Sequence, residues 1–196
     1  GAAAAISERG SSSSANPLFA YGRWGPALVM LYGAIWIAVG PKAPVGWGDS
    51  STYLDMAVRL PEVLAVGDAG YFALRILPSA VVHLALRFLG LPLDPEHAFR
   101  LFELLDVGLL VLGAWAWGRI GRVLGWDGPT QWAGFTLLFL SLAVSGFGLV
   151  VPPLTDTAAM VLGLLQAWFF LAGRGVPLLL VTLAAAFTWP QAFVAG

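Results

Sequence analysis

The chain has 196 residues, of which 59% are hydrophobic and only 11% are charged. Soluble domains usually carry about 25% charged residues, so this composition predicts an integral membrane protein. The net charge of −1 offers no basic surface for nucleic acid, and the absence of cysteine excludes disulfides, thiol catalysis and cysteine-bound metals.

Residues 1–22 are predicted to form a disordered or tag-like tail. Their first part, "GAAAAISERGSSSSANP", is rich in Ala and Ser and lacks the apolar core of a secretory signal. We expect residues 23–196 to form a transmembrane helical domain. The chain has no initiating Met and stops beside an apolar stretch, which predicts that it is part of a longer protein.

Six apolar stretches are candidates for membrane spans, each of which needs about 20 mostly apolar residues. They cover roughly residues 24–40, 71–90, 99–118, 131–151, 154–173 and 176–194. The expected fold class is therefore all-α. We expect a polytopic membrane protein with roughly five to six hydrophobic helices and a short interfacial helix in the first outer loop.

The second stretch, "YFALRILPSAVVHLALRFLG", carries polar side chains at a regular spacing. Arg75, Ser79, His83 and Arg87 recur every four residues and therefore form one stripe on a helix. Two arginines facing lipid would be costly, so the stripe must face protein, water or headgroups. Two interpretations remain open: an amphipathic helix lying in the membrane interface, and a helix that lines a site for an anionic ligand.

The distribution of arginine predicts the side of the membrane on which each loop lies, because short cytoplasmic loops tend to be rich in Arg. Arg119, Arg122 and Arg174 lie in two short loops, whereas "GFGLVVPPLTD" contains no basic residue. We expect the two arginine loops inside and the last loop outside. If all six stretches cross with the N-terminus inside, the loop with Asp49 is outside but "PPLTD" falls inside. If residues 71–90 lie along the outer interface or re-enter the membrane, both loops are outside and the chain makes about five crossings, which is the arrangement we favour.

Asp49 begins the segment "GDSSTYLDMA", which has two interpretations. In the first, Asp49, Ser50 or Ser51 caps the helix that follows, and Asp55 pairs with Arg59 four residues later. In the second, Asp49 belongs to a functional site.

Asp156 has the same two interpretations. Thr155 or Asp156 suits the N-cap of the helix that follows, and Pro152 and Pro153 suit the turn before it. Asp156 is also a lone acid at the mouth of a long apolar helix, on the same predicted side as Asp49.

Arg100, Glu103 and Asp106 are spaced so that they share one helix face near the start of the third span. Acids inside a membrane are candidates for function. We prefer the alternative in which the span starts later and these side chains form a solvated, partly self-paired helix end.

The last span contains "FTWPQAF". Pro190 is expected to kink or end the helix, and Thr188, Trp189 and Gln191 could line a cavity.

Three segments together resemble a known family. "GDSSTYLDMA", "YFALRILPSAV" and "PLTDTAAMVLGLL", in this order, are similar to the N-terminal membrane module of GT-C-fold glycosyltransferases, polytopic enzymes that use polyprenyl-phosphate-linked sugars. The resemblance runs through residues 24–173. The chain departs from the family in two respects: Asp49 is followed by Ser50 rather than by a second carboxylate, and the family's C-terminal spans are missing.

The resemblance implies roles for individual residues. Asp49 takes the place of the acid in the first outer loop, which acts as general base on the acceptor or helps to hold a divalent cation. Asp156 matches a second acid that faces the same cavity, and Arg75 could contact the lipid phosphate, where negative charge develops. Tyr53, one turn from Asp49, and His83, on the stripe of Arg75, are further candidates for substrate binding.

Two functions are carried forward. In the first, the chain is a glycosyltransferase-like protein of the bacterial inner membrane that transfers a sugar from a polyprenyl-phosphate donor at the periplasmic face. In the second, it is a non-catalytic accessory subunit of a larger membrane complex. Both imply membrane lipids as partners and exclude nucleic acid; the first adds the lipid-linked donor, the second the complex.

Overall fold

A computed structural model describes residues 21–45, 47–66, 74–140 and 147–189. Within these ranges the chain forms helices and no strand, so the predicted all-α fold is confirmed. The helices are α1 Tyr21–Val39, α2 Ser50–Val66, α3 Ile76–Leu89, α4 Pro95–Val123, α5 Gly128–Phe139, α6 Phe147–Val150, α7 Asp156–Leu171 and α8 Gly175–Ala186.

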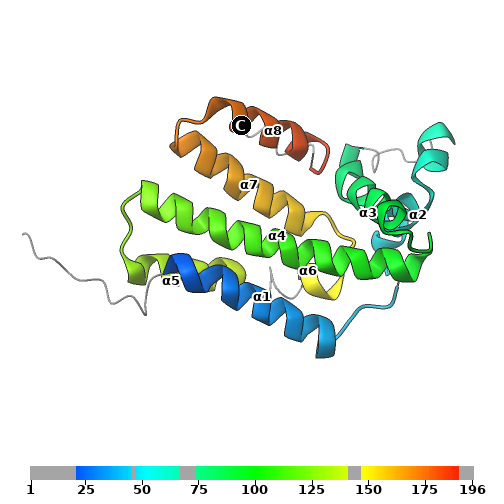
Figure 1. The fold of residues 1–196 in the computed structure, drawn as a ribbon, viewed down its shortest axis with the longest axis horizontal. Coiled ribbons are helices and arrows are strands. Elements are labelled where there is room, and N and C mark those ends of the chain that lie inside the picture. Colours follow the sequence, from blue (N-terminus) through cyan, green and yellow to red (C-terminus); the bar gives the residue numbers. More distant parts are fainter. Residues whose placement is uncertain (1–20, 46, 67–73, 141–146, 190–196) are drawn as a thin grey trace, which may run out of the picture.

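Helix α4 lies at the centre of the molecule (Figure 1). It packs most extensively against α1 on one side and α7 on the other, and α7 in turn packs against α8. Helices α5 and α6 pack against α1 and α4, while α2 and α3 pack together at the end where α4 begins. The bundle therefore has one end formed by α2 and α3 and an opposite end formed by the C-terminus of α4 and the turn between α7 and α8.

Glycines let α4 approach its neighbours closely. A Cβ atom added to Gly33 of α1 would lie 2.6 Å from Val107 Cγ2 on α4, and one added to Gly113 of α4 would lie 3.0 Å from Val161 Cγ2 on α7. Small residues serve this purpose in membrane helix pairs, where close packing replaces hydrophobic burial. At the start of α1, the Tyr21 hydroxyl donates a hydrogen bond of 2.7 Å to the Ala114 carbonyl and fixes α1 on α4.

The start of α4 is set by its own residues. The Asp94 carboxylate accepts a 2.9 Å hydrogen bond from the His97 amide, and Pro95 occupies the first helical position, where a missing N–H costs nothing. This amide hydrogen bond, together with one from the His97 ring, lowers the pKa of Asp94. Helix α4 consequently begins four residues before the predicted span.

The predicted polar stripe faces α2 except for its last arginine, which is exposed. Pro61 interrupts α2 and has no N–H to offer the carbonyl of Ala57, one turn earlier. His83 Nδ1 lies 2.8 Å from this carbonyl oxygen and donates to it, since a carbonyl can only accept. The Ser79 hydroxyl donates a 3.1 Å hydrogen bond to the Tyr53 carbonyl. Ser79 and His83 are therefore buried between α2 and α3, as expected of a stripe that faces protein.

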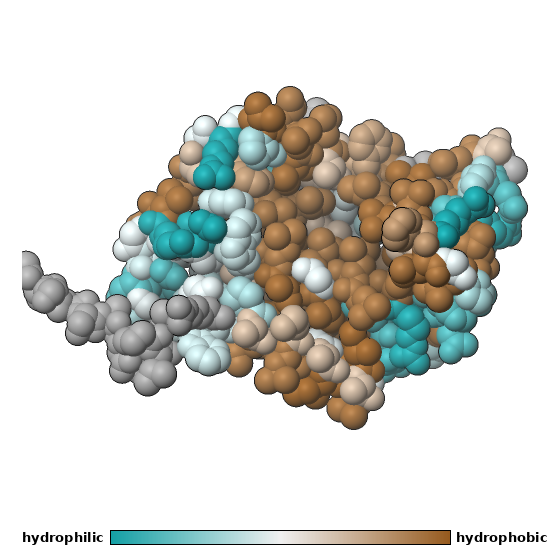
Figure 2. Space-filling model, viewed as in Figure 1, coloured by the Kyte–Doolittle hydropathy of each residue, from teal (hydrophilic) through white to brown (hydrophobic). Residues whose placement is uncertain are grey.

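Apolar side chains cover the middle of the molecule, and hydrophilic residues gather toward both ends (Figure 2). The apolar surface includes large side chains that are more than half exposed: Met30, Leu31 and Ile35 on α1, Leu104 on α4, Leu137 on α5, Phe170 on α7, and Val176, Leu179 and Leu180 on α8 or its start. Exposed apolar surfaces of this kind mark contact with a membrane or a partner.

The observed helices differ in length from the predicted membrane spans. Within the described ranges, α4 is the one helix whose length and composition suffice to cross a membrane; α3, α7, α8 and the apolar part of α1 are shorter. The predicted span over residues 131–151 is not one continuous helix, because α5 ends at Phe139 and α6 has only four residues. The tail expected over residues 1–22 overlaps α1, which already begins at Tyr21.

Candidate functional site

The loops that carry Asp49 and Asp156 meet at the α2–α3 end of the bundle. The Ala43 amide donates a 3.0 Å hydrogen bond to the Val150 carbonyl, and Trp36 Nε1 donates one of 3.0 Å to the Leu149 carbonyl. Leu154 packs against the apolar cluster that α2, α3 and α4 form together. The sequence separates these loops by about a hundred residues, but the fold joins them.

Asp49 precedes the first residue of α2 and is exposed. Its backbone carbonyl accepts the first helical hydrogen bonds, from the amides of Thr52 at 3.1 Å and Tyr53 at 3.4 Å. The Ser50 and Ser51 hydroxyls donate backward to carbonyls in the preceding turn. No hydrogen bond joins the Asp49 carboxylate to the described residues, so the predicted side-chain cap is not formed and the carboxylate is accessible.

The rest of the predicted local pairing in α2 is present. Asp55 and Arg59 form the expected ion pair, with oxygen and nitrogen 3.5 Å apart, and both side chains are exposed. Such a pair adds little stability. Asp55 is thus a second exposed acid on the same helix as the Asp49 turn, with an ordinary surface role.

Tyr53, Arg75 and Trp189 come together from three elements. Arg75 Nη1 lies 3.4 Å from the Tyr53 hydroxyl, and its guanidinium carbon lies 3.7 Å from the centre of the Trp189 ring. Tyr53 is buried, whereas Arg75 is half-buried. Two of the residues predicted to bind substrate therefore contact each other, and the predicted cavity residue Trp189 covers the guanidinium group. Pro190 and Gln191 lie outside the described residues.

His83 has the structural role described above, because its Nδ1 donates a hydrogen bond to the Ala57 carbonyl. Its predicted part in substrate binding remains a prediction.

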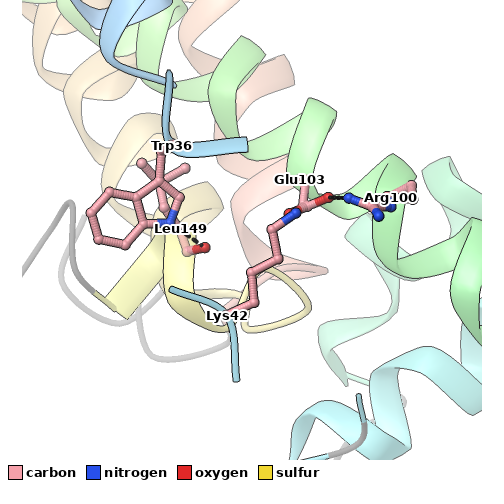
Figure 3. Close-up of polar contacts among 5 residues, drawn as sticks. All are labelled: Trp36, Lys42, Arg100, Glu103 and Leu149. Carbon is pink, nitrogen blue, oxygen red and sulfur yellow. Dashed lines mark hydrogen bonds and ion pairs between the residues drawn. The ribbon is translucent and has the colours of Figure 1, made fainter. Parts of the chain in front are cut away.

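Glu103 is held between two cations (Figure 3). Its Oε1 lies 2.6 Å from Lys42 Nζ, and its Oε2 accepts a 3.2 Å hydrogen bond from Arg100 Nη1. Glu103 is only 2% exposed, since the loop after α1 covers it. The expected pairing with Arg100 is confirmed, but the expected solvation is wrong: α4 starts earlier than predicted and other segments close over this face.

A pocket of about 240 Å³ opens beside this ion pair. It is lined by Lys42, Ala43, Val45, Glu96, Phe99 and Arg100. Asp49 and Asp156 do not line it, so the cavity that these two acids are expected to share stays a prediction. Lys42 was not singled out from the sequence, because a single lysine in a loop carries no pattern that distinguishes it from a solvated charge.

Asp106 is near enough to Asp156 to feel its negative charge. Asp106 is 2% exposed, and it interacts with the Asp156 carboxylate and with the Thr157 hydroxyl. Its Oδ2, like the buried hydroxyl of Thr155, has no hydrogen-bond partner among the described residues. Asp156 itself is exposed and is the first residue of α7, and Thr155 occupies the N-cap position without forming a side-chain cap.

Asp106 is thus within the electrostatic range of Asp156, and its burial contradicts the solvation that the sequence predicts for it. In the sequence, the spacing that puts Arg100, Glu103 and Asp106 on one helix face was the signal that could have identified Asp106 as a site residue. No group of three or more His, Asp or Glu side chains suited to a metal occurs in the described part of the chain. Two carboxylates and a free hydroxyl nevertheless offer oxygen ligands of the kind that hard divalent cations prefer.

Comparison of the chain with protein families, with characterised proteins and with solved structures finds no significant match.

Proposed function

We propose that this chain is a multi-pass membrane protein of the GT-C glycosyltransferase type. The observation that carries the proposal is the meeting of three segments at one end of the bundle: the Asp49 turn with Tyr53, the start of α3 with Arg75, and the start of α7 with Asp156. These are the segments on which the resemblance rests, and the apolar bundle behind them fits a membrane.

The membrane part of the proposal is supported by the exposed apolar surface across the middle of the molecule. The directions of α1, α4, α7 and α8 fit the sides of the membrane that the five-crossing arrangement requires (Figure 1). In this arrangement α2 and α3 stay on the outer side. Helix α1 would be about 28 Å long, α7 about 24 Å and α8 about 18 Å, so α7 and α8 require a locally thinner bilayer or extension by the turns at their ends.

In the proposed reaction, Asp49 accepts the proton of the acceptor hydroxyl as this oxygen attacks the anomeric carbon of the sugar. The polyprenyl phosphate leaves with the bonding electrons of the sugar–oxygen bond, and Arg75 stabilises its negative charge. Tyr53 and Trp189 hold Arg75 in position. An exposed carboxylate without a hydrogen-bond partner among the described residues suits a base that must meet an incoming acceptor.

Asp156 and Asp106 form the supporting acidic pair. They would hold a divalent cation, which would supply positive charge toward the leaving phosphate. Asp106 Oδ2 fits this role because it is buried with no donor among the described residues.

The test is sugar transfer in membranes that carry the protein, with tritiated polyprenyl-phosphate mannose, glucose and arabinose as donors. Asp49→Asn is expected to reduce transfer by at least about a hundredfold, because a positioned base contributes that much or more. Asp55→Asn is the matched control: it is also an exposed acid of this region, paired only with Arg59, and full activity is expected.

Undiminished transfer by Asp49→Asn would contradict the assigned base. If neither the native protein nor any variant transfers sugar, and the native protein is recovered in fixed stoichiometry with a larger membrane complex, the chain is an accessory subunit. The exposed apolar face of α8, on which Leu179 is 59% and Leu180 62% exposed, would then be a surface for that complex.

A further inference from the structure

The end of the bundle opposite Asp49 carries a cluster of arginine and tryptophan. The Arg–Trp cluster consists of Trp115 and Arg119 on α4, Trp168 on α7 and Arg174 in the turn before α8. The guanidinium carbon of Arg119 lies 4.8 Å from the centre of the Trp115 ring and 5.8 Å from that of Trp168. The guanidinium carbon of Arg174 lies 5.6 Å from the Trp168 ring. Two cations from separate segments thus converge on one indole.

No acidic side chain in the described part of the chain balances the charge of this cluster. None of the ion pairs in the described part of the chain includes Arg119, Arg122 or Arg174. Arg119 Nε is buried and has no hydrogen-bond partner among the same residues. Asp127, the acid next in sequence to this end of α4, accepts a hydrogen bond from the Thr130 amide instead. Like charges held close together repel, so a bound anion would stabilise this arrangement.

The surroundings indicate that the anion is attached to an apolar body. Phe170 and Val176, on either side of Arg174, are 73% and 74% exposed. Arginine matches the geometry of a phosphate group, and its planar guanidinium stacks on tryptophan while its N–H groups remain free to donate. A ligand that is anionic at one end and apolar at the other could pair with the arginines and also cover the exposed apolar side chains.

We propose that the Arg–Trp cluster binds the phosphate of an anionic phospholipid whose acyl chains lie along α7 and α8. Basic sites between helices at the inner membrane surface are suited to such headgroups. The inference rests on the membrane location proposed above, but it is independent of sugar transfer. The two proposals place a phosphate-binding site at each end of the bundle. The donor lipid would bind at Arg75, and a second, non-reacting lipid would bind at Arg119 and Arg174.

The experiment measures lipid binding to the full chain in a neutral detergent by native mass spectrometry, with phosphatidylglycerol and phosphatidylcholine as probes. The native protein is expected to bind phosphatidylglycerol at least about tenfold more tightly than phosphatidylcholine. Arg119→Gln with Arg174→Gln is expected to abolish this preference. Arg174→Gln alone, at an exposed turn where misfolding is not a concern, is expected to weaken it severalfold.

Arg87→Gln is the matched control, because Arg87 is an exposed arginine at the other end of the bundle with no ion pair in the described structure. This variant is expected to keep the preference. Equal binding of the two lipids by the native protein, or an unchanged preference in the double variant, would overturn the proposal. Displacement of phosphatidylglycerol by inorganic phosphate would also overturn it, since the site would then recognise free phosphate. Release of the protein from membranes by alkaline carbonate would instead contradict the proposed membrane location, and with it the lipid site that depends on this location.

Discussion

At the scale of single residues, Glu103 shows how the site end of the bundle is held together. A buried carboxylate is costly unless it is paired, and Glu103 has both Lys42 from the loop after α1 and Arg100 from its own helix. The bond to Lys42 ties that loop to α4. Since the same loop continues to Asp49, the ion pair helps to position the proposed base.

Removal of Lys42, one of the two cations that pair with Glu103, tests whether this ion pair stabilises the fold. Lys42→Met is expected to lower the free energy of unfolding by about 2 kcal/mol, because it leaves a buried carboxylate with one of its two cations. Adding Glu103→Gln is expected to recover part of the loss, because the neutral amide has no charge to bury. Both variants are compared with native protein in thermal unfolding in detergent. Equal stability of Lys42→Met and the native protein would show that this ion pair contributes nothing.

At the scale of elements, α2 and α3 are joined through a defect in α2. Pro61 leaves the Ala57 carbonyl without its helical donor, Arg59 departs from helical geometry beside it, and His83 of α3 supplies the missing hydrogen bond. The stripe that contains His83 therefore orders the α2–α3 pair, and this pair positions Tyr53 against Arg75.

A double-mutant cycle checks this compensation. His83→Phe is expected to lower the free energy of unfolding by about 1–3 kcal/mol, because a buried carbonyl loses its donor. In the background of Pro61→Ala the same change is expected to cost less, since residue 61 then has an N–H for Ala57. The cost of His83→Phe is measured by thermal unfolding in both backgrounds. Equal costs would mean that Pro61 and His83 act independently.

The elements also show what could be predicted from the sequence. Helices follow from apolar composition and spacing, and the Asp55–Arg59 pair follows from a separation of four residues, because these effects are local. The burial of Glu103 and Asp106 could not be predicted in this way, since it depends on loops distant in sequence that close over α4. The position of Pro61 was a usable signal for a free carbonyl at Ala57, but its donor on α3 could be identified only from the packing.

At the scale of the whole molecule, charge is distributed unequally between the two ends. Arg119, Arg122 and Arg174 lie at the end where α4 finishes and α7 turns into α8, whereas Asp49 and Asp156 lie at the other. If the chain crosses a membrane, arginine-rich loops favour the cytoplasmic side. The proposed base then faces outward.

The absence of cysteine makes this orientation directly testable. Ser51→Cys and Thr130→Cys place single thiols at exposed positions at the two ends. In intact cells, a membrane-impermeant maleimide is expected to label Ser51→Cys strongly and Thr130→Cys only after lysis. Labelling is read from the mass shift of the purified protein. Labelling of the two variants in the opposite order would invert the proposed orientation, and equal labelling of both in intact cells would argue against a membrane-spanning arrangement.

The central position of α4 also has a consequence for biosynthesis. Helix α1 leaves the ribosome before α4, yet its Gly33 surface fits Val107 of α4, and its Tyr21 hydroxyl requires the Ala114 carbonyl. Neither partner exists until α2 and α3 have been made. Helix α1 must therefore remain without its packing partner until α4 has been synthesised. The bundle can assemble only then, because α4 contributes one surface to α1 and another to α7, which is synthesised later.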